Sequence, residues 1–151
     1  MNMLNAIKYE FRGFRTIKID YTRLKDQPLV SFTIGTKKNQ WDEKNGIYEL
    51  VTEFELMFGD EKTLVVFSSG FKIVDLEWLD LMAEQTVVNE LFRTVFPYLT
   101  QKLQTITSDF RPGLVLPVFD MKKFDFTKKI IFNLNRVQPE KQNNSSNEEI
   151  N

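Results

Sequence analysis

The sequence predicts an α+β fold in which a four-stranded antiparallel sheet packs against a long C-terminal helix and a second, shorter C-terminal element. Three observations favour it. The first half of the chain alternates apolar and polar residues with the period of two that strands show. Residues 85–110 carry an apolar stripe at the spacing of three or four that helices show. Residues 121–137 alternate like a strand, although Thr127 would also suit the cap of a short helix beginning at Lys128.

The first predicted strand is long and bent. Its apolar residues alternate with polar neighbours, stop at residues 13–14 and then resume, which indicates a bulge. These residues are Ile7, Tyr9, Phe11, Ile17, Ile19 and Tyr21. The second strand alternates from Val30 to Ile34, and the polar stretch 36–45 after it is predicted to be a loop that holds Trp41.

The third and fourth strands differ in their pattern. In the third, one face is apolar and the other is mostly glutamate, so one side should be buried and the other wet. The apolar face holds Tyr48, Leu50, Phe54 and Leu56. After a polar turn at residues 59–62, residues 63–75 are apolar on both faces, which predicts a central strand.

Two features of the predicted helical region bear on its shape and its packing. Pro97 falls inside the apolar stripe, where it must either kink one long helix or begin the second of two consecutive helices. Phe92, Phe96 and Tyr98 widen the apolar face beyond what one sheet contact needs, which indicates a second packing partner.

Composition limits the function classes. The 151 residues predict one domain over residues 1–137, followed by a polar, disordered tail over 138–151. The net charge of -1 and the lack of an arginine-rich run make nucleic acid an unexpected partner. No apolar run approaches the roughly 20 residues that span a bilayer, and the start has no long apolar leader, so a cytoplasmic protein without a membrane segment is expected.

The chain contains no Cys and no His. It therefore cannot form a thiolate nucleophile, a Ser-His-Asp triad or a Cys/His zinc site, and neither GxxxxGK nor GxGxxG occurs. Asp75, Glu77 and Asp80 lie close together, but their spacing suits the capped, solvated first turns of a short helix. We predict no catalytic residue, no metal and no cofactor, since an enzyme would have to work with carboxylates, Lys, Tyr and Ser alone.

The segment 111–117 poses the main functional question. Leu114, Val115 and Leu116 lie between Pro112 and Pro117, so they cannot join a helix interior, and they have no polar alternation that would turn one face to water. They need a cover, which could be the body of the domain, a second subunit or an apolar client.

These segments, in this order, resemble the SecB family of bacterial export chaperones. The likeness covers residues 46–126. It is carried by GIYELVTEFELMFGDEKTLVVFSSGF at 46–71, LFRTVFPYLTQKLQTITSDF at 91–110 and GLVLPVFDMKKF at 113–124. The resemblance implies a homotetramer, built as a dimer of dimers, that holds unfolded chains or preproteins in apolar grooves without ATP.

The resemblance also implies which residues act. In the family the groove runs between the loop joining the first two strands and the loop joining the helices. The client-binding residues then correspond to Tyr21, Leu24, Pro28, Phe110, Leu114, Val115, Leu116 and Phe119. Because the family buries the long helix between subunits, the oligomer interface is expected at Phe92, Phe96, Leu99 and Leu103.

The chain also departs from the family. Val65-Val66-Phe67 stand where the family has a carboxylate that docks the SecA motor, so SecA docking is not expected. This favours a divergent branch, such as the toxin-antitoxin-associated chaperones. A SecB-fold adaptor or assembly protein serving one dedicated partner therefore stays open beside a general holdase.

Overall fold

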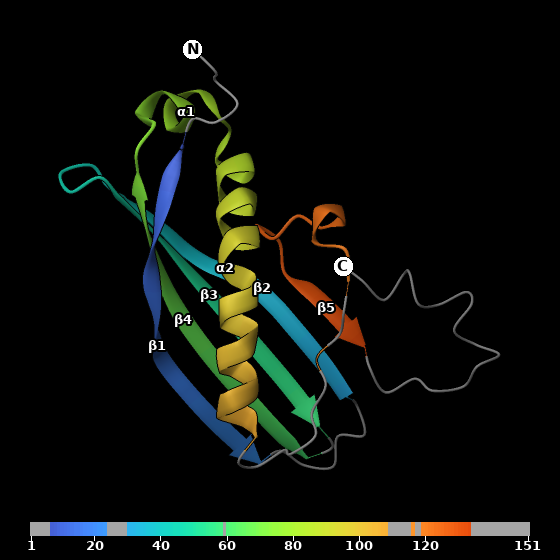
Figure 1. Ribbon diagram of the computed structural model, residues 1–151. Helices are drawn as coiled ribbons and strands as arrows, with labels where there is room; N and C mark the ends of the chain where they lie inside the picture. The colour runs from blue at the N-terminus through green and yellow to red at the C-terminus, as the bar shows by residue number, and fades with distance from the viewer. Residues whose placement is uncertain (1–6, 24–29, 59, 109–115, 117–118, 134–151) are drawn as a thin grey trace.

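The computed structural model describes residues 7–23, 30–58, 60–108, 116 and 119–133. Within these residues, one antiparallel sheet has the strand order β1-β4-β3-β2-β5 (Figure 1). Its strands are β1 Tyr9–Arg23, β2 Val30–Asp42, β3 Ile47–Phe58, β4 Glu61–Ile73 and β5 Ile130–Asn133. The predicted count of four strands is wrong, since the described sheet has five. The ambiguous C-terminal segment supplies the fifth, which pairs with residues 31–34 of β2.

Strand β1 is bent where the sequence predicted a bulge. Its pairing with β4 shifts between Phe11 and Gly13, and Gly13 has φ 115°, a conformation that glycine adopts without steric cost. A second shift follows between Thr16 and Lys18. As a result Ile17 lines a hollow with Val66 on the face opposite the long helix, while Ile19 lies opposite buried Val65. The expectation that Ile17 and Ile19 share one face is therefore wrong.

The predicted loop at residues 36–45 is mostly strand. Strand β2 continues to Asp42, and the reversal is confined to residues 43–46, where Gly46 has φ 68°. Trp41 therefore lies in the strand, opposite Tyr48 of β3. Pairing with β3 overrides the polar composition because alternate side chains of this stretch lie on the uncovered face of the sheet.

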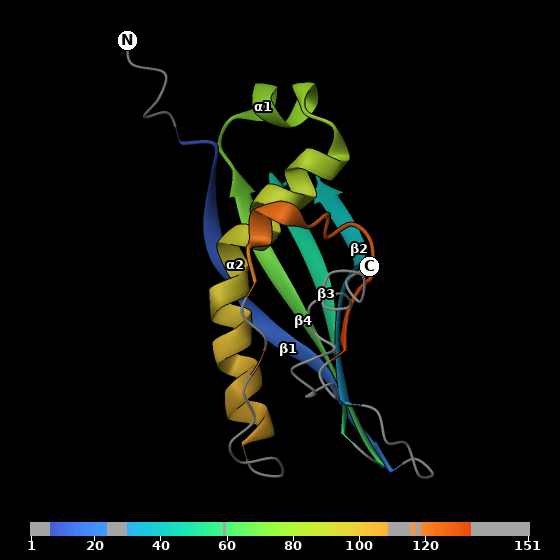
Figure 2. The ribbon, with the colours of Figure 1, turned by 90° about the vertical axis from the view of Figure 1, so that its right-hand side faces the viewer.

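The structure decides two open questions, namely whether Pro97 lies within one helix or between two, and whether a helix begins at Lys128. Helix α1 is Leu76–Leu81, and Asp75 caps it by accepting a hydrogen bond from the Trp78 N–H, as predicted. Helix α2 is one continuous helix, Glu84–Thr107, with Pro97 inside it. Proline offers no N–H to the carbonyl of Arg93, and Figure 2 shows that α2 bends along its length. No helix forms at Lys128: a 3-10 turn, η2 Met121–Lys123, leads instead toward β5.

The core lies between α2 and the face of the sheet that α2 crosses (Figures 1 and 2). Alternate residues of β3 and β4 face it, including fully buried Leu50, Phe54 and Phe67. Val88, Leu91 and other members of the α2 stripe cover them. No helix among the described residues is both long and apolar enough to cross a bilayer.

Candidate functional site

The structure describes part of the predicted client-binding groove. Leu24, Pro28, Phe110, Leu114 and Val115 lie outside the described residues. The three members within them are Tyr21, Leu116 and Phe119, and their environments differ.

Tyr21 is a surface residue near the end of β1, with 46% of its area exposed. It lies opposite Thr63 on β4. A hydrogen bond with Glu61 raises the pKa of the Tyr21 hydroxyl. The side chain therefore offers an apolar ring to solvent while its polar end is engaged.

Leu116 belongs to the core of the domain. Only 7% of its area is exposed, and it is part of the main apolar cluster. The protomer itself therefore buries this residue, without a second subunit or a client. A role as groove surface would require Leu116 to become accessible.

Phe119 lies in a phenylalanine cluster that joins α2 to the C-terminal part of the chain. Its ring centroid is 5.5 Å from that of Phe96 on α2, 4.6 Å from Phe132 on β5 and 5.2 Å from Phe124. Such spacings are typical of favourable aromatic pairs. The members of the phenylalanine cluster are Phe92, Phe96, Phe119, Phe124, Phe126 and Phe132.

The phenylalanine cluster has a buried base and a partly open rim. Phe92 and Phe126 are fully buried, with their centroids 4.3 Å apart, and Phe132 is 6% exposed. Phe96, Phe119 and Phe124 are half-buried. The rim thus leaves aromatic surface partly exposed, above a base that the protomer buries.

A polar contact holds this segment against α2. Asn89, which is 7% exposed, accepts a 2.6 Å hydrogen bond from the Phe126 N–H and donates to the Asp125 carboxylate. Gln85 and Thr127 also donate to Asp125. Burial disfavours ionisation of Asp125, but the hydrogen bonds from Thr127 and Asn89 outweigh it, so its pKa lies below the ordinary value.

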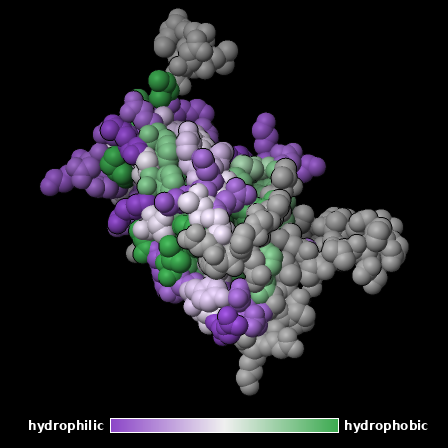
Figure 3. All heavy atoms as spheres, turned by 60° about the horizontal axis from the view of Figure 1, so that its bottom comes forward, coloured by the Kyte–Doolittle hydropathy of each residue, from purple (hydrophilic) through white to green (hydrophobic). Residues whose placement is uncertain are grey.

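The predicted interface residues on α2 are mostly core. Phe92, Leu99 and Leu103 are 0% exposed because the protomer's own sheet and C-terminal segment cover them. The described protomer therefore holds these three side chains in its own core, and their place in an oligomer interface stays a prediction. Phe96 is half-buried, and Tyr98, 50% exposed, stacks on Phe11 of β1 at 5.2 Å. From below, the described surface shows apolar patches divided by polar ones (Figure 3).

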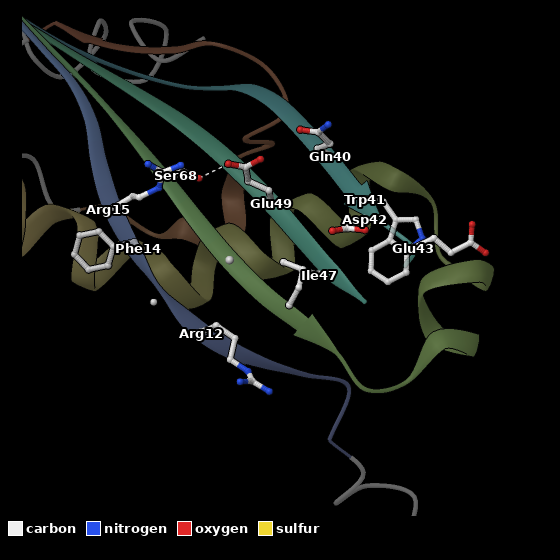
Figure 4. A pocket seen from close by; sticks show the side chains of 12 residues that line it. Arg12, Phe14, Arg15, Gln40, Trp41, Asp42, Glu43, Ile47, Glu49 and Ser68 are labelled. Carbon is white, nitrogen blue, oxygen red and sulfur yellow. Dashed lines mark hydrogen bonds between the residues drawn. The ribbon is translucent and has the colours of Figure 1, made fainter. Parts of the chain in front are cut away.

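The opposite face of the sheet carries a shallow basin of about 720 Å³ (Figure 4). Arg12 and Arg15 of β1 lie along one side, and Glu49 of β3 accepts a hydrogen bond from the Ser68 hydroxyl across the basin. The cross-strand pair Gly13 and Gly70 adds no side chain to its floor. Among the described residues, no group of three or more Asp and Glu could share a metal ion.

Comparison with known proteins gives a match in structure but none in sequence. No protein-family model and no curated protein sequence matches the chain. The fold matches a Mycobacterium tuberculosis SecB-like chaperone, Rv1957, solved in complex with a ChAD peptide from the HigA1 antitoxin. The TM-score is 0.53 and the identity 10%, over 75% of this chain and 91% of the chaperone. The chain has the SecB-like fold.

The likeness predicted from sequence is thus confirmed at the level of the fold. Within this SecB-like fold, sequence reasoning missed Phe124, Phe126 and Phe132 as partners of Phe119, and it missed the role of Asn89. Alternation in residues 124–132 was a usable signal, since a strand there would direct its aromatic residues to one face. Asn89 carried no such signal, because its partner lies 37 residues away.

Proposed function

We propose that the chain is an ATP-independent chaperone that holds unfolded polypeptides, including preproteins awaiting export, on apolar surface beside α2. The observation that carries the proposal is the half-buried rim of the phenylalanine cluster in a chain with the SecB-like fold. The groove would extend from this rim to Leu24, Pro28, Phe110, Leu114 and Val115, with Tyr21 at the far end of β1. We also propose a cytoplasmic location, where such clients would be held.

The chemistry of holding needs no catalytic residue. An unfolded client exposes apolar side chains that gain free energy when they leave water, about 25 cal/mol per Å² of apolar surface buried. Aromatic rings held in place by the protomer lose little conformational entropy on contact. Release would follow from competition by folding or by a downstream acceptor, which requires no nucleotide site.

We further propose that the protein works as a homo-oligomer, with a dimer of dimers as the expected form. Strand β1 is 15 residues long and pairs with β4 alone among the described strands, and Ile19 and Tyr98 leave half of their area exposed. The proposed interface keeps Phe96 from the residues predicted from sequence. It also includes Tyr98, which was not among them. SecA docking forms no part of the proposal, and the boundary between domain and tail at Val137 stays a prediction.

A dedicated adaptor is the second candidate. The specific observation favouring it is that the SecB-like chaperone with the matching fold was solved with a peptide from an antitoxin. An adaptor would prevent aggregation of one partner, whereas a general holdase would protect several unrelated unfolded proteins at near-stoichiometric ratio.

The test is suppression of aggregation of several unrelated unfolded proteins by Phe119→Ser and Phe124→Ser variants. Both should lose most holding per folded molecule, because each removes a rim ring. The matched control is Ile131→Ser on β5, which removes a 36%-exposed side chain next in sequence to Phe132. Leu116→Ala should instead lower stability by about 2 to 5 kcal/mol and leave holding per folded molecule unchanged. Undiminished holding by both rim variants would overturn the proposal.

A further inference from the structure

Strand β2 has an unpaired edge beyond its contact with β5. The pairing with β5 stops at Ile34, and the Thr36 hydroxyl donates to the Phe126 carbonyl just beyond it. From Asn39 to Trp41, β3 is the one strand partner of β2 within the described part of the chain. An unpaired edge presents backbone N–H and C=O groups to which an extended chain can add as a further strand.

A cleft lined by both polar and apolar residues lies beside this edge. It has a volume of about 260 Å³ and is formed between the β2–β3 hairpin and the turn from α1 to α2; in Figure 2 the end of β2 lies below α1. We name it the hairpin cleft. Its lining consists of Asn39, Trp41, Tyr48, Leu79, Asp80, Met82, Glu84 and Val87. Met82 is 41% exposed and the neighbouring Leu81 71% exposed, so apolar surface continues outside the hairpin cleft.

The polar groups of the hairpin cleft point to the chemistry of its occupant. Asp80 and Glu84 form no ion pair within the described residues. Burial, and then the charge of Glu84, raise the pKa of Tyr48 to about 12, so the hydroxyl stays protonated. Two unpaired carboxylates favour a cationic partner.

We propose that the hairpin cleft and the adjacent edge of β2 bind an extended segment of a partner polypeptide that carries an apolar and a basic side chain two positions apart. Added as a strand, such a segment places both side chains on the same face, because side chains alternate with a period of two. The apolar side chain enters between Trp41 and Met82, and the basic one reaches Asp80 and Glu84. The chain's own residues 138–151 fit poorly, since they hold three Glu and one Lys.

The experiment measures binding of labelled peptides to the full-length protein by fluorescence anisotropy. The probe is a short peptide with leucine and lysine at alternating odd positions and serine between them, and its twin has glutamate in place of lysine. The lysine peptide should bind at least about tenfold more tightly, a factor that corresponds to about 1.4 kcal/mol. Asp80→Lys and Met82→Glu should each weaken it severalfold, whereas Glu77→Lys, which makes the same charge change on α1 outside the hairpin cleft, should not.

Two further peptides test strand addition. Both are the lysine peptide with every second backbone amide N-methylated. In one peptide the methyl groups block the amides that would face β2, and in the other they block the amides that would face away from it. Loss of binding in one phase alone is expected. Equal binding of the lysine and glutamate peptides, equal effects of Asp80→Lys and Glu77→Lys, or retained binding in both phases would overturn the proposal. The result is independent of client holding, because Phe119→Ser should leave peptide binding intact.

Discussion

Asn89 links α2 to the C-terminal segment through both ends of its side-chain amide. Its oxygen accepts from the Phe126 N–H, and its nitrogen donates to the Gln85 carbonyl and to Asp125. The residue is 7% exposed, so these partners are shielded from water. One polar side chain thus sets where the phenylalanine cluster meets the helix.

Removing this side chain should destabilise the fold. Asn89→Ala leaves the buried Phe126 N–H without an acceptor, which costs about 1 to 3 kcal/mol. Urea unfolding of the variant and the wild type measures the difference. Gln101→Ala, on the exposed side of α2, is the control and should change stability by less than about 0.5 kcal/mol. Equal stability of Asn89→Ala and wild type would contradict this account of the anchor.

Asp125 should make stability depend on acid pH. Its pKa in the folded protein lies below the ordinary value of 3.8, so its ionised form stabilises the fold above that value. The contribution is lost as pH falls through the depressed folded pKa. Stability measured by urea unfolding between neutral pH and pH 3 should therefore fall less steeply in Asp125→Asn than in wild type. Parallel curves would show that Asp125 does not contribute.

Helix α1 is short, and its first turn depends on a side-chain cap. Asp75 accepts from the Trp78 N–H, and the Trp78 ring packs beneath the helix with Tyr9 at 5.5 Å. A helix of six residues has few internal hydrogen bonds, so capping and the burial of Trp78 provide most of its stability.

Loss of the cap should therefore be measurable. Asp75→Ala should cost about 1 kcal/mol, within the range of 0.5 to 2 kcal/mol found for N-cap replacements. The matched control is Asp80→Ala on the same helix, which removes an exposed carboxylate without capping function. Thermal unfolding of both variants checks the prediction. If the two lowered the melting temperature equally, the cap would contribute nothing specific.

The assembled molecule should be larger than one chain. An unpaired edge as long as β1 favours pairing or cover by another chain, and half-exposed Tyr98 lies beside it, stacked on Phe11. Light scattering at micromolar concentration should give the mass of a dimer or a tetramer. Tyr98→Glu should lower that mass and leave the circular dichroism spectrum unchanged, while Gln101→Glu on the same helix should not. A monomeric mass for the wild type would contradict the predicted assembly.

Local patterns predicted most elements of this fold. The period of two located the strands, the helical stripe located α2, and Asp75 indicated the cap of α1. These signals depend on neighbours within a few positions, which is why one sequence sufficed. The same signals failed at residues 36–42, where pairing with β3 makes a strand of a polar segment.

The candidate site depended on contacts between distant residues. A stripe on α2 does not reveal which of its faces the protomer covers, so Phe92, Leu99 and Leu103 looked available to a partner until their burial was known. Phe119 was predicted as a site residue, but its neighbours on α2 and β5 come from positions 23 residues earlier and 13 residues later. The sequence by itself predicted the type of most elements and the excess of apolar side chains on the long helix, because these follow from local periodicity and composition. Tertiary packing decided which apolar side chains remain at the surface, because burial depends on what folds against each face.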